Sequence, residues 1–244
     1  MNYSNYCERE WRKFILGGAS GMYIRTELNT YTKHSVSRRY GFVPDQADMP
    51  RVLILGDSIS GGTWEVFSKL FSNSSIANFH GPPDNCGGFS RYSAFLTSWL
   101  GECPWDVIQF NVGMHFHLKP NESMDSSYRE GLAMVVEQLR RHSPAASLVF
   151  AFTTPSPFDS NDTTPDEATC VNYHHFHKKG FVSKLNDIAR DFVSSMNITI
   201  NDRYQAILPF IGQQQRPCDI HFNEAGYKLI AKQDISVISK LLSK

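Results

Sequence analysis

The sequence has little of several features that mark particular classes of protein. Its 244 residues include only five cysteines, and none of them form a Cys-x-x-Cys pair, so we expect neither a disulfide scaffold nor a zinc knuckle. No apolar run approaches the roughly 20 residues that span a bilayer. The charges balance, with 24 Lys and Arg against 24 Asp and Glu. This balance lacks the basic excess that is typical of a protein that binds nucleic acid.

The chain does have enough apolar residues for a sizeable core. Hydrophobic residues make up 41% of it and aromatic residues 13%, which excludes disorder over most of its length. The length fits one domain of roughly 200–250 residues, or at most two small ones. We place that domain at residues 49–244. Residues 1–48 are polar and rich in aromatics, and we expect them to form an N-terminal extension that packs on or near the domain.

The first residues and the glycosylation motifs bear on the cellular compartment of the protein. Residues 1–13 are charged and contain no apolar segment, so they do not resemble a signal peptide. N-x-[ST] sequons nevertheless occur more often than chance predicts, at Asn2, Asn73, Asn121, Asn161 and Asn197. This excess leans weakly toward a secreted protein whose leader is missing, and a Ser- and Asn-rich cytosolic chain is the alternative. In a secreted protein, the odd number of cysteines leaves at least one thiol unpaired.

From Arg51 onward, short apolar runs alternate with helical patterns. We predict strands at 52–55, 76–79, 106–112, 148–152 and 198–200, and helices at 60–72, 90–100, 124–142, 181–196 and 223–242. This alternation predicts an α/β fold with a parallel sheet and right-handed crossovers. In such sheets the functional site lies beyond the carboxyl ends of the strands. The residues that follow each strand are therefore the first candidates for a site.

The first strand is followed by Gly56, Asp57 and Ser58. A serine between a buried strand and a helix can be exposed on a tight turn, with its hydroxyl and its N–H facing the same space. This arrangement suits a nucleophile. The alternative is a serine that merely caps the helix.

The segments after the second and third strands supply candidate ligand contacts. Gly87 and Gly88 would let the backbone approach a ligand closely, or would simply form a flexible turn. Asn111 is a candidate hydrogen-bond donor after the third strand. His115 and His117 share one side of an extended segment, but no obvious carboxylate or third histidine is placed nearby, so we do not expect a metal site.

An acid and a histidine precede the last helix. His221 could act as a general base toward a serine, and Asp219 could orient its imidazole. The alternative is an Asp cap beside a surface histidine. Taken together, a serine after strand one, a glycine after strand two, a polar side chain after strand three and this pair form the ordered set that a serine-hydrolase site needs.

These residues resemble the sequence blocks of the SGNH/GDSL hydrolase superfamily. Gly56-Asp57-Ser58-Ile59 resembles the first block, and Asn85 to Ser90 resembles the second. Trp105 to His115 resembles the third block of a branch related to carbohydrate esterases, and Asp219 to Tyr227 resembles the last. The resemblance covers residues 50–242.

The resemblance implies a three-layer α/β/α sandwich with a five-stranded parallel sheet in flavodoxin-like order. It implies hydrolysis without a metal or another cofactor, with Ser58 as nucleophile, His221 as base and Asp219 as the acid. The oxyanion donors would be the N–H groups of Ser58 and Gly88, with Gly87 as the alternative glycine, and the His115 side chain. The candidate substrate-binding residues are Asp57, Asn85, Gly87 and Asn111.

The chain departs from the family pattern at two positions. His115 stands where the family's third block usually has asparagine, and Asn111 is an alternative donor. The family's acid usually stands three residues before the histidine, which here is Cys218, whereas Asp219 stands two residues before His221.

We therefore expect a serine esterase that hydrolyses small acyl esters, foremost acetyl esters, of a carbohydrate. The loop at 156–177 is expected to border the cleft, where its aromatic residues could stack on a sugar or line an acyl pocket. The alternatives are a lipase or thioesterase, an acyltransferase with the same site, or a non-catalytic binding protein with the SGNH fold. The expected partner is a small-molecule or saccharide ester, with no nucleic acid and no membrane span, and the oligomeric state stays open.

Overall fold

The computed structural model describes residues 45–71, 76–81, 87–101, 103–159, 170 and 179–243. The predicted N-terminal extension lies outside the described residues except for its last four positions. Its packing against the domain therefore stays a prediction.

Five parallel strands form one sheet in the order β2-β1-β3-β4-β5. The strands are β1 (Arg51–Leu55), β2 (Asn78–His80), β3 (Val107–Phe110), β4 (Ser147–Ala151) and β5 (Thr199–Asn201). The predicted parallel sheet and its flavodoxin-like order are confirmed. Because the order reverses at β1, the connections leave in opposite directions there and open a crevice at the carboxyl edge.

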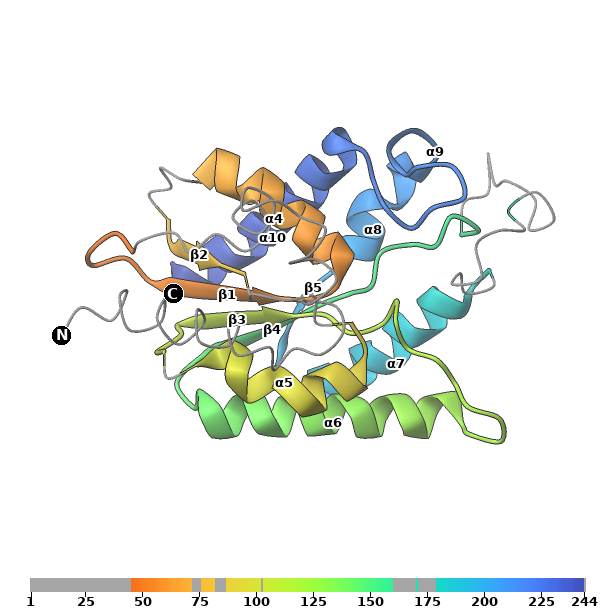
Figure 1. The fold of residues 1–244 in the computed structure, drawn as a ribbon, viewed down its shortest axis with the longest axis horizontal. Helices are drawn as coiled ribbons and strands as arrows, with labels where there is room; N and C mark the ends of the chain where they lie inside the picture. The colour runs from red at the N-terminus through yellow and green to blue at the C-terminus, as the bar shows by residue number, and fades with distance from the viewer. Residues whose placement is uncertain are drawn as a thin grey trace, which may run out of the picture.

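Helices cover both faces of the sheet (Figure 1). The helices α5 (Phe89–Leu100), α6 (Met124–His142) and α7 (Phe181–Ser195) lie on one face, and α4 (Ser58–Phe71) and α10 (Glu224–Leu242) lie on the other. The sheet is therefore the middle of three layers, as predicted. Within the described residues, no helix is both long enough and apolar enough to cross a bilayer.

The core consists of two apolar layers that the sheet separates. The amphipathic pattern predicted for 124–142 is observed: α6 turns one face to the sheet, with the buried residues Tyr128, Leu132, Val135, Val136 and Leu139. All residues of β1 and β3 are buried. A strand that is covered on both faces has a continuous apolar sequence. For this reason the run at 52–55 predicts a buried strand.

The structure differs from the sequence prediction in several places: β2 begins at Asn78 and not at 76, and α4 begins at Ser58 and not at 60. Strand β3 ends at Phe110 and not at Val112, because the chain turns away from the sheet, with the Phe116 N–H donating to the Gly113 carbonyl. Three short elements that the periodicity did not predict connect β5 to α10. They are α8 (Arg203–Ile207), η1 (Leu208–Phe210) and α9 (Ile211–Gln214).

A buried ion pair fixes α10 relative to α4. The Arg203 guanidinium binds the Asp234 carboxylate through two hydrogen bonds of 2.7 and 2.6 Å, and its third nitrogen donates to the Ser60 Oγ at 3.0 Å. Asn201 donates to the same carboxylate at 2.7 Å and to Gln109 at 2.8 Å. Charges in the interior need such partners, since an unpaired one would cost several kcal/mol.

The residues just before β1 cover the outer strand β2. Asn78 and the Gln46 backbone exchange two hydrogen bonds, and His80 contacts Asp45 with 2.7 Å between Nε2 and Oδ1. The Arg51 guanidinium contacts the same carboxylate. These contacts hold the segment before β1 against the outer strand of the sheet.

Candidate active site

Ser58 is the first residue of α4, directly after the turn that ends β1. The helix cap is Asp57, whose Oδ1 accepts the Ile59 N–H at 2.9 Å. Ser58 is therefore not the cap, and its hydroxyl is free to serve another purpose. The N–H of a first helical residue has no carbonyl partner within its own helix and carries the positive end of the helix dipole.

Asp219 and His221 lie on a hairpin between α9 and α10. The antiparallel bridge between Gln215 and Phe222 forms its base, and the Arg216 N–H donates to the His221 carbonyl at 2.9 Å. Asn223 caps α10 by accepting the Gly226 N–H at 3.0 Å. Because Asn223 is the cap, Asp219 is free to bind elsewhere.

The fold joins the serine, the histidine and the acid in one chain of hydrogen bonds. The His221 Nε2 lies 2.8 Å from the Ser58 Oγ, and the His221 Nδ1 lies 2.7 Å from the Asp219 Oδ1. The side chains of His221 and Asp219 are 32% and 20% exposed, so solvent and substrate can reach them. These are the contacts that a serine nucleophile, its base and the orienting acid require.

The short Asp-x-His spacing is compatible with this contact because of a local turn. The Asp219 Oδ1 accepts the His221 backbone N–H at 3.1 Å as well as contacting its ring Nδ1. An Asx-type turn of this kind folds the side chain back over the following two residues. The acid therefore reaches the imidazole directly, without the extra residue that the family pattern has.

Two of the predicted oxyanion donors lie against each other. Gly88 precedes α5, and a Cβ atom placed on it would lie 2.8 Å from the His115 carbonyl oxygen and 3.6 Å from the His115 Cβ. Only a glycine allows this approach. The His115 and His117 side chains are both exposed. The roles of Gly88 and His115 toward an oxyanion stay predictions.

Asn111 and Asp57 border a small recess beyond the carboxyl ends of β1, β3 and β4, together with Ile59, Phe152, Thr153, Thr154 and Arg203. The Asn111 amide donates to the Ala151 carbonyl at 2.7 Å and to the Thr153 Oγ1 at 3.4 Å. Asn111 thus ties the end of β3 to the end of β4. That structural role favours His115 as the side-chain donor.

The remaining predicted site residues are only partly covered by the structure. Gly87 is buried with a φ of 54°, which favours glycine. Asn85 lies outside the described residues, as does the loop at 156–177 except for residues 156–159 and Cys170. Among the described residues, no three His, Cys, Asp or Glu side chains gather where they could hold a metal ion.

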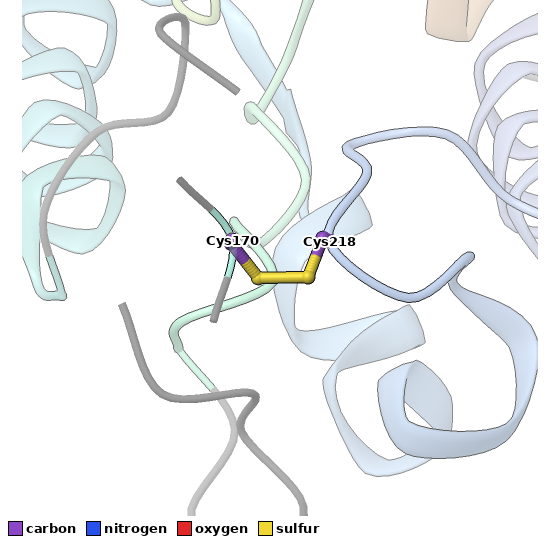
Figure 2. The surroundings of a disulfide bond; sticks show 2 residues. All are labelled: Cys170 and Cys218. Carbon is purple, nitrogen blue, oxygen red and sulfur yellow. A yellow bond between two sulfur atoms is a disulfide. The ribbon is translucent and has the colours of Figure 1, made fainter. Parts of the chain in front are cut away.

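The structure also reveals residues near the site that sequence reasoning missed. Gln215 is buried, and its amide donates to the carbonyls of Pro155 at 2.9 Å and Ile220 at 3.3 Å. It therefore joins the hairpin to the segment after β4. A disulfide bond links Cys218, next to the acid, to Cys170 (Figure 2). Neither the contacts of Gln215 nor the disulfide can be predicted from a local sequence pattern, because each joins parts of the chain that are distant in sequence.

Tyr227 packs between the two halves of the site. Gly62 in α4 makes room for its ring, because a Cβ there would lie 2.3 Å from the Tyr227 Cζ. Burial is the main cause that raises the pKa of the Tyr227 hydroxyl to about 12; the charges of Asp57 and Asp219 act in the same direction, and a hydrogen bond with the Phe222 backbone and the charge of Arg216 oppose them. The hydroxyl is therefore neutral at physiological pH.

The three-layer fold with its five-stranded parallel sheet is similar to that of solved G-D-S-L family structures, so the resemblance is confirmed at the level of the fold. No protein-family model and no curated protein sequence matches the chain.

Solved structures do match it, among them three of low sequence identity. A member of the lipolytic G-D-S-L family from Veillonella parvula is 18% identical with a TM-score of 0.53, covering 77% of this chain and 97% of its own. The acetyl xylan esterase AlAXEase is 14% identical with a TM-score of 0.55, covering 76% and 98%. A carbohydrate esterase family 3 protein from Talaromyces cellulolyticus is 15% identical with a TM-score of 0.57, covering 80% and 99%. At these identities the likeness establishes the fold alone.

Proposed function

We propose that this protein is a serine esterase that hydrolyses small acyl esters, foremost acetyl esters of a carbohydrate. The observation that carries the proposal is the chain of contacts from the Ser58 Oγ through His221 to Asp219, at 2.8 and 2.7 Å. A bare serine hydroxyl is a weak nucleophile, and an adjacent base of this kind activates it.

The reaction proceeds in two steps. The Ser58 Oγ attacks the ester carbonyl while the His221 Nε2 takes its proton, and Asp219 stabilises the imidazolium that forms. The N–H groups of Ser58 and Gly88 and the His115 side chain bind the oxyanion. His221 then protonates the leaving alcohol, and water repeats the sequence on the acyl-enzyme.

The choice of substrate is supported by the solved structures of the same fold. Two of those named above are described as an acetyl xylan esterase and a carbohydrate esterase. The sequence of the third block points to the same branch. The site is partly open at His221, which is compatible with a bulky alcohol such as a saccharide.

The experiment is hydrolysis of p-nitrophenyl esters from acetate through butyrate to octanoate, with Ser58→Ala as the comparison. We expect turnover that falls with acyl length and that drops by about 10⁴- to 10⁶-fold in Ser58→Ala. Ser236→Ala, at an exposed position of α10, is the matched control and should leave turnover unchanged.

Other outcomes would change the assignment. Turnover that rises with acyl length would indicate a lipase or thioesterase. Transfer of the acetyl group to a sugar hydroxyl in preference to water would indicate an acyltransferase. If Ser58→Ala has no effect on any ester, the protein is not an enzyme of this class, and a non-catalytic binding role replaces the proposal.

A further inference from the structure

We propose that the Cys170–Cys218 disulfide positions the catalytic acid: it holds the tip of the hairpin so that Asp219 can contact His221 across the short spacing. The inference rests on the proposed function of these residues. The bond joins residues 48 positions apart, one in the connection between β4 and α7 and one at the hairpin tip (Figure 2).

The backbone conformation at the tip is the first argument. Cys218 directly precedes Asp219 and has a φ of 51°, in the left-handed region that residues other than glycine avoid. The Asp219 N–H closes this turn by donating to the Arg216 carbonyl at 3.1 Å. The direction in which Asp219 leaves the turn therefore depends on the conformation of Cys218.

The second argument is that a single oxygen atom of Asp219 makes both contacts with His221. The Asp219 Oδ1 contacts both the backbone N–H and the ring Nδ1 of His221, at 3.1 and 2.7 Å. Because the packing of Ile220 and the bridge at Phe222 hold the chain beyond Asp219, a change of conformation at Cys218 would move Asp219 relative to His221 and weaken both contacts together. His221 would then lose the group that fixes its ring toward Ser58.

The third argument is where the hairpin is anchored. Its base is held by Gln215, through the bridge to Phe222 and the amide contacts described above. On the far side of Asp219, Ile220 packs against Met114 and Val182. On the near side, the anchor is the covalent bond of Cys218 to Cys170. Asp219 thus lies between a packed side chain and a disulfide.

The test compares two ways of removing the same cross-link. Both double variants lack the disulfide. In Cys170→Ser/Cys218→Ser, residue 218 keeps the Cβ that disfavours the left-handed conformation. In Cys170→Ser/Cys218→Gly, residue 218 has no Cβ. Labelling of Ser58 by a fluorophosphonate measures the reactivity of the serine without a chosen ester. The low-field proton resonance of the His221–Asp219 hydrogen bond reports on the contact itself.

We expect the serine pair to label Ser58 about 5- to 30-fold more slowly than the native protein, which is the population penalty of the left-handed conformation for a residue with a Cβ. Glycine enters that conformation about as readily as any other, so the glycine variant should label within about twofold of the native rate. The proton resonance should weaken in the first variant and return in the second.

Repeating the comparison in Asp219→Ala, which has no oxygen to contact His221, separates positioning from general stabilisation. Once the contact is gone, exchanging both cysteines for serine should change the labelling rate by less than about twofold, because the two sites act through one interaction. A disulfide that only stabilised the fold would cause the same loss in both backgrounds. It would also give no advantage to glycine at position 218.

The inference is overturned if the serine pair labels at the native rate with an unchanged resonance, or if the glycine variant is no faster than the serine pair. If Ser58 of the native protein is not labelled at all, the proposed function fails and this inference falls with it. All rates are measured below the melting temperature of each variant. If the Cys170→Ser/Cys218→Ser variant does not fold, the single variant Cys170→Ala replaces it in the comparison. This variant removes the disulfide and leaves Cys218 in place.

Discussion

The Nε2 atom of His221 lies 2.8 Å from the Oγ of Ser58, although 163 positions separate the two residues. Ser58 begins the helix after the first strand, and His221 lies just before the last helix. The two helices that follow them, α4 and α10, pack side by side on one face of the sheet (Figure 1). The contact is therefore a consequence of how the chain winds, and it connects the two ends of the domain.

The side-chain donor to the oxyanion can be tested with a pair of exposed histidines. We expect His115→Ala to lower kcat by about 10²- to 10³-fold, the usual cost of one oxyanion donor. His115→Asn should keep most of the activity, because an amide N–H can take the same role. His117→Ala is the matched control and should leave kcat unchanged. Equal effects of the two alanine variants would exclude the role of His115.

Two adjacent glycines of α4 should respond in opposite directions to alanine. Gly61→Ala meets no atom within 4 Å, so we expect a gain in unfolding free energy of up to about 1 kcal/mol from helix propensity. Gly62→Ala would place a Cβ 2.3 Å from the Tyr227 ring, and we expect a loss of about 1–3 kcal/mol from overpacking. Denaturant unfolding measures both. Similar effects of the two variants would contradict the packing described here.

Gln215 should act on the reaction through the hairpin that it holds. Gln215→Met removes the donor to the Pro155 and Ile220 carbonyls, and we expect kcat to fall by about 10- to 10²-fold through misplacement of His221. KM should change much less, since no substrate contact is lost. Gln213→Met, at an exposed position two residues earlier, is the control. If both variants keep the native kcat, Gln215 has no positioning role.

The buried His80 should make the fold sensitive to acid. Burial lowers the pKa of His80 below its ordinary value of 6.5, even though Asp45 opposes the shift. His80 therefore binds a proton more tightly in the unfolded state than in the folded state. Its contribution to the free energy of unfolding is present at neutral pH and is lost as the pH falls below about 6.5.

The pKa of Asp45 is lowered too, because the contacts with His80 and Arg51 outweigh the opposing effect of burial. Its contribution is lost only at still lower pH, below its ordinary pKa of 3.8.

The melting temperature between pH 7.5 and 4.5 tests this prediction. We expect the native protein to lose stability over this range and His80→Gln to have a flatter profile, since glutamine does not titrate. His117→Gln, at an exposed position, should follow the native curve. A His80→Gln profile parallel to the native one would show that another group is responsible for the acid sensitivity.

The alternation of strands and helices was predictable because each element carries its own pattern. The buried run at Val52–Leu55 and the amphipathic face of α6 are local signals, and both were found in place. The short helices α8 and α9 carry too few turns for a periodic signal, and they were missed. The end of β3 was placed too late, because where a strand leaves a sheet depends on its neighbours.

The candidate site was predictable as a set of residue types and not as a geometry. Ser58, Asp219 and His221 stand out because they follow or precede regular elements at the edge where such sites form. Whether Asp219 could reach His221 from two residues away depended on the local turn in which the Asp219 Oδ1 also accepts the His221 backbone N–H. The part of Asn111 in joining β3 to β4 likewise follows from its position beside Ala151 and Thr153.

By itself, the sequence determined the class of fold, the order of its main elements and the candidate residues for acyl transfer, because apolar periodicity and side-chain chemistry are properties of short segments. Only the tertiary structure decided which distant groups meet: Ser58 with His221, Gly62 with Tyr227, and Cys170 with Cys218. Such contacts arise when the whole chain packs its two apolar layers against one sheet. No local pattern records them, since each partner alone is compatible with many surroundings.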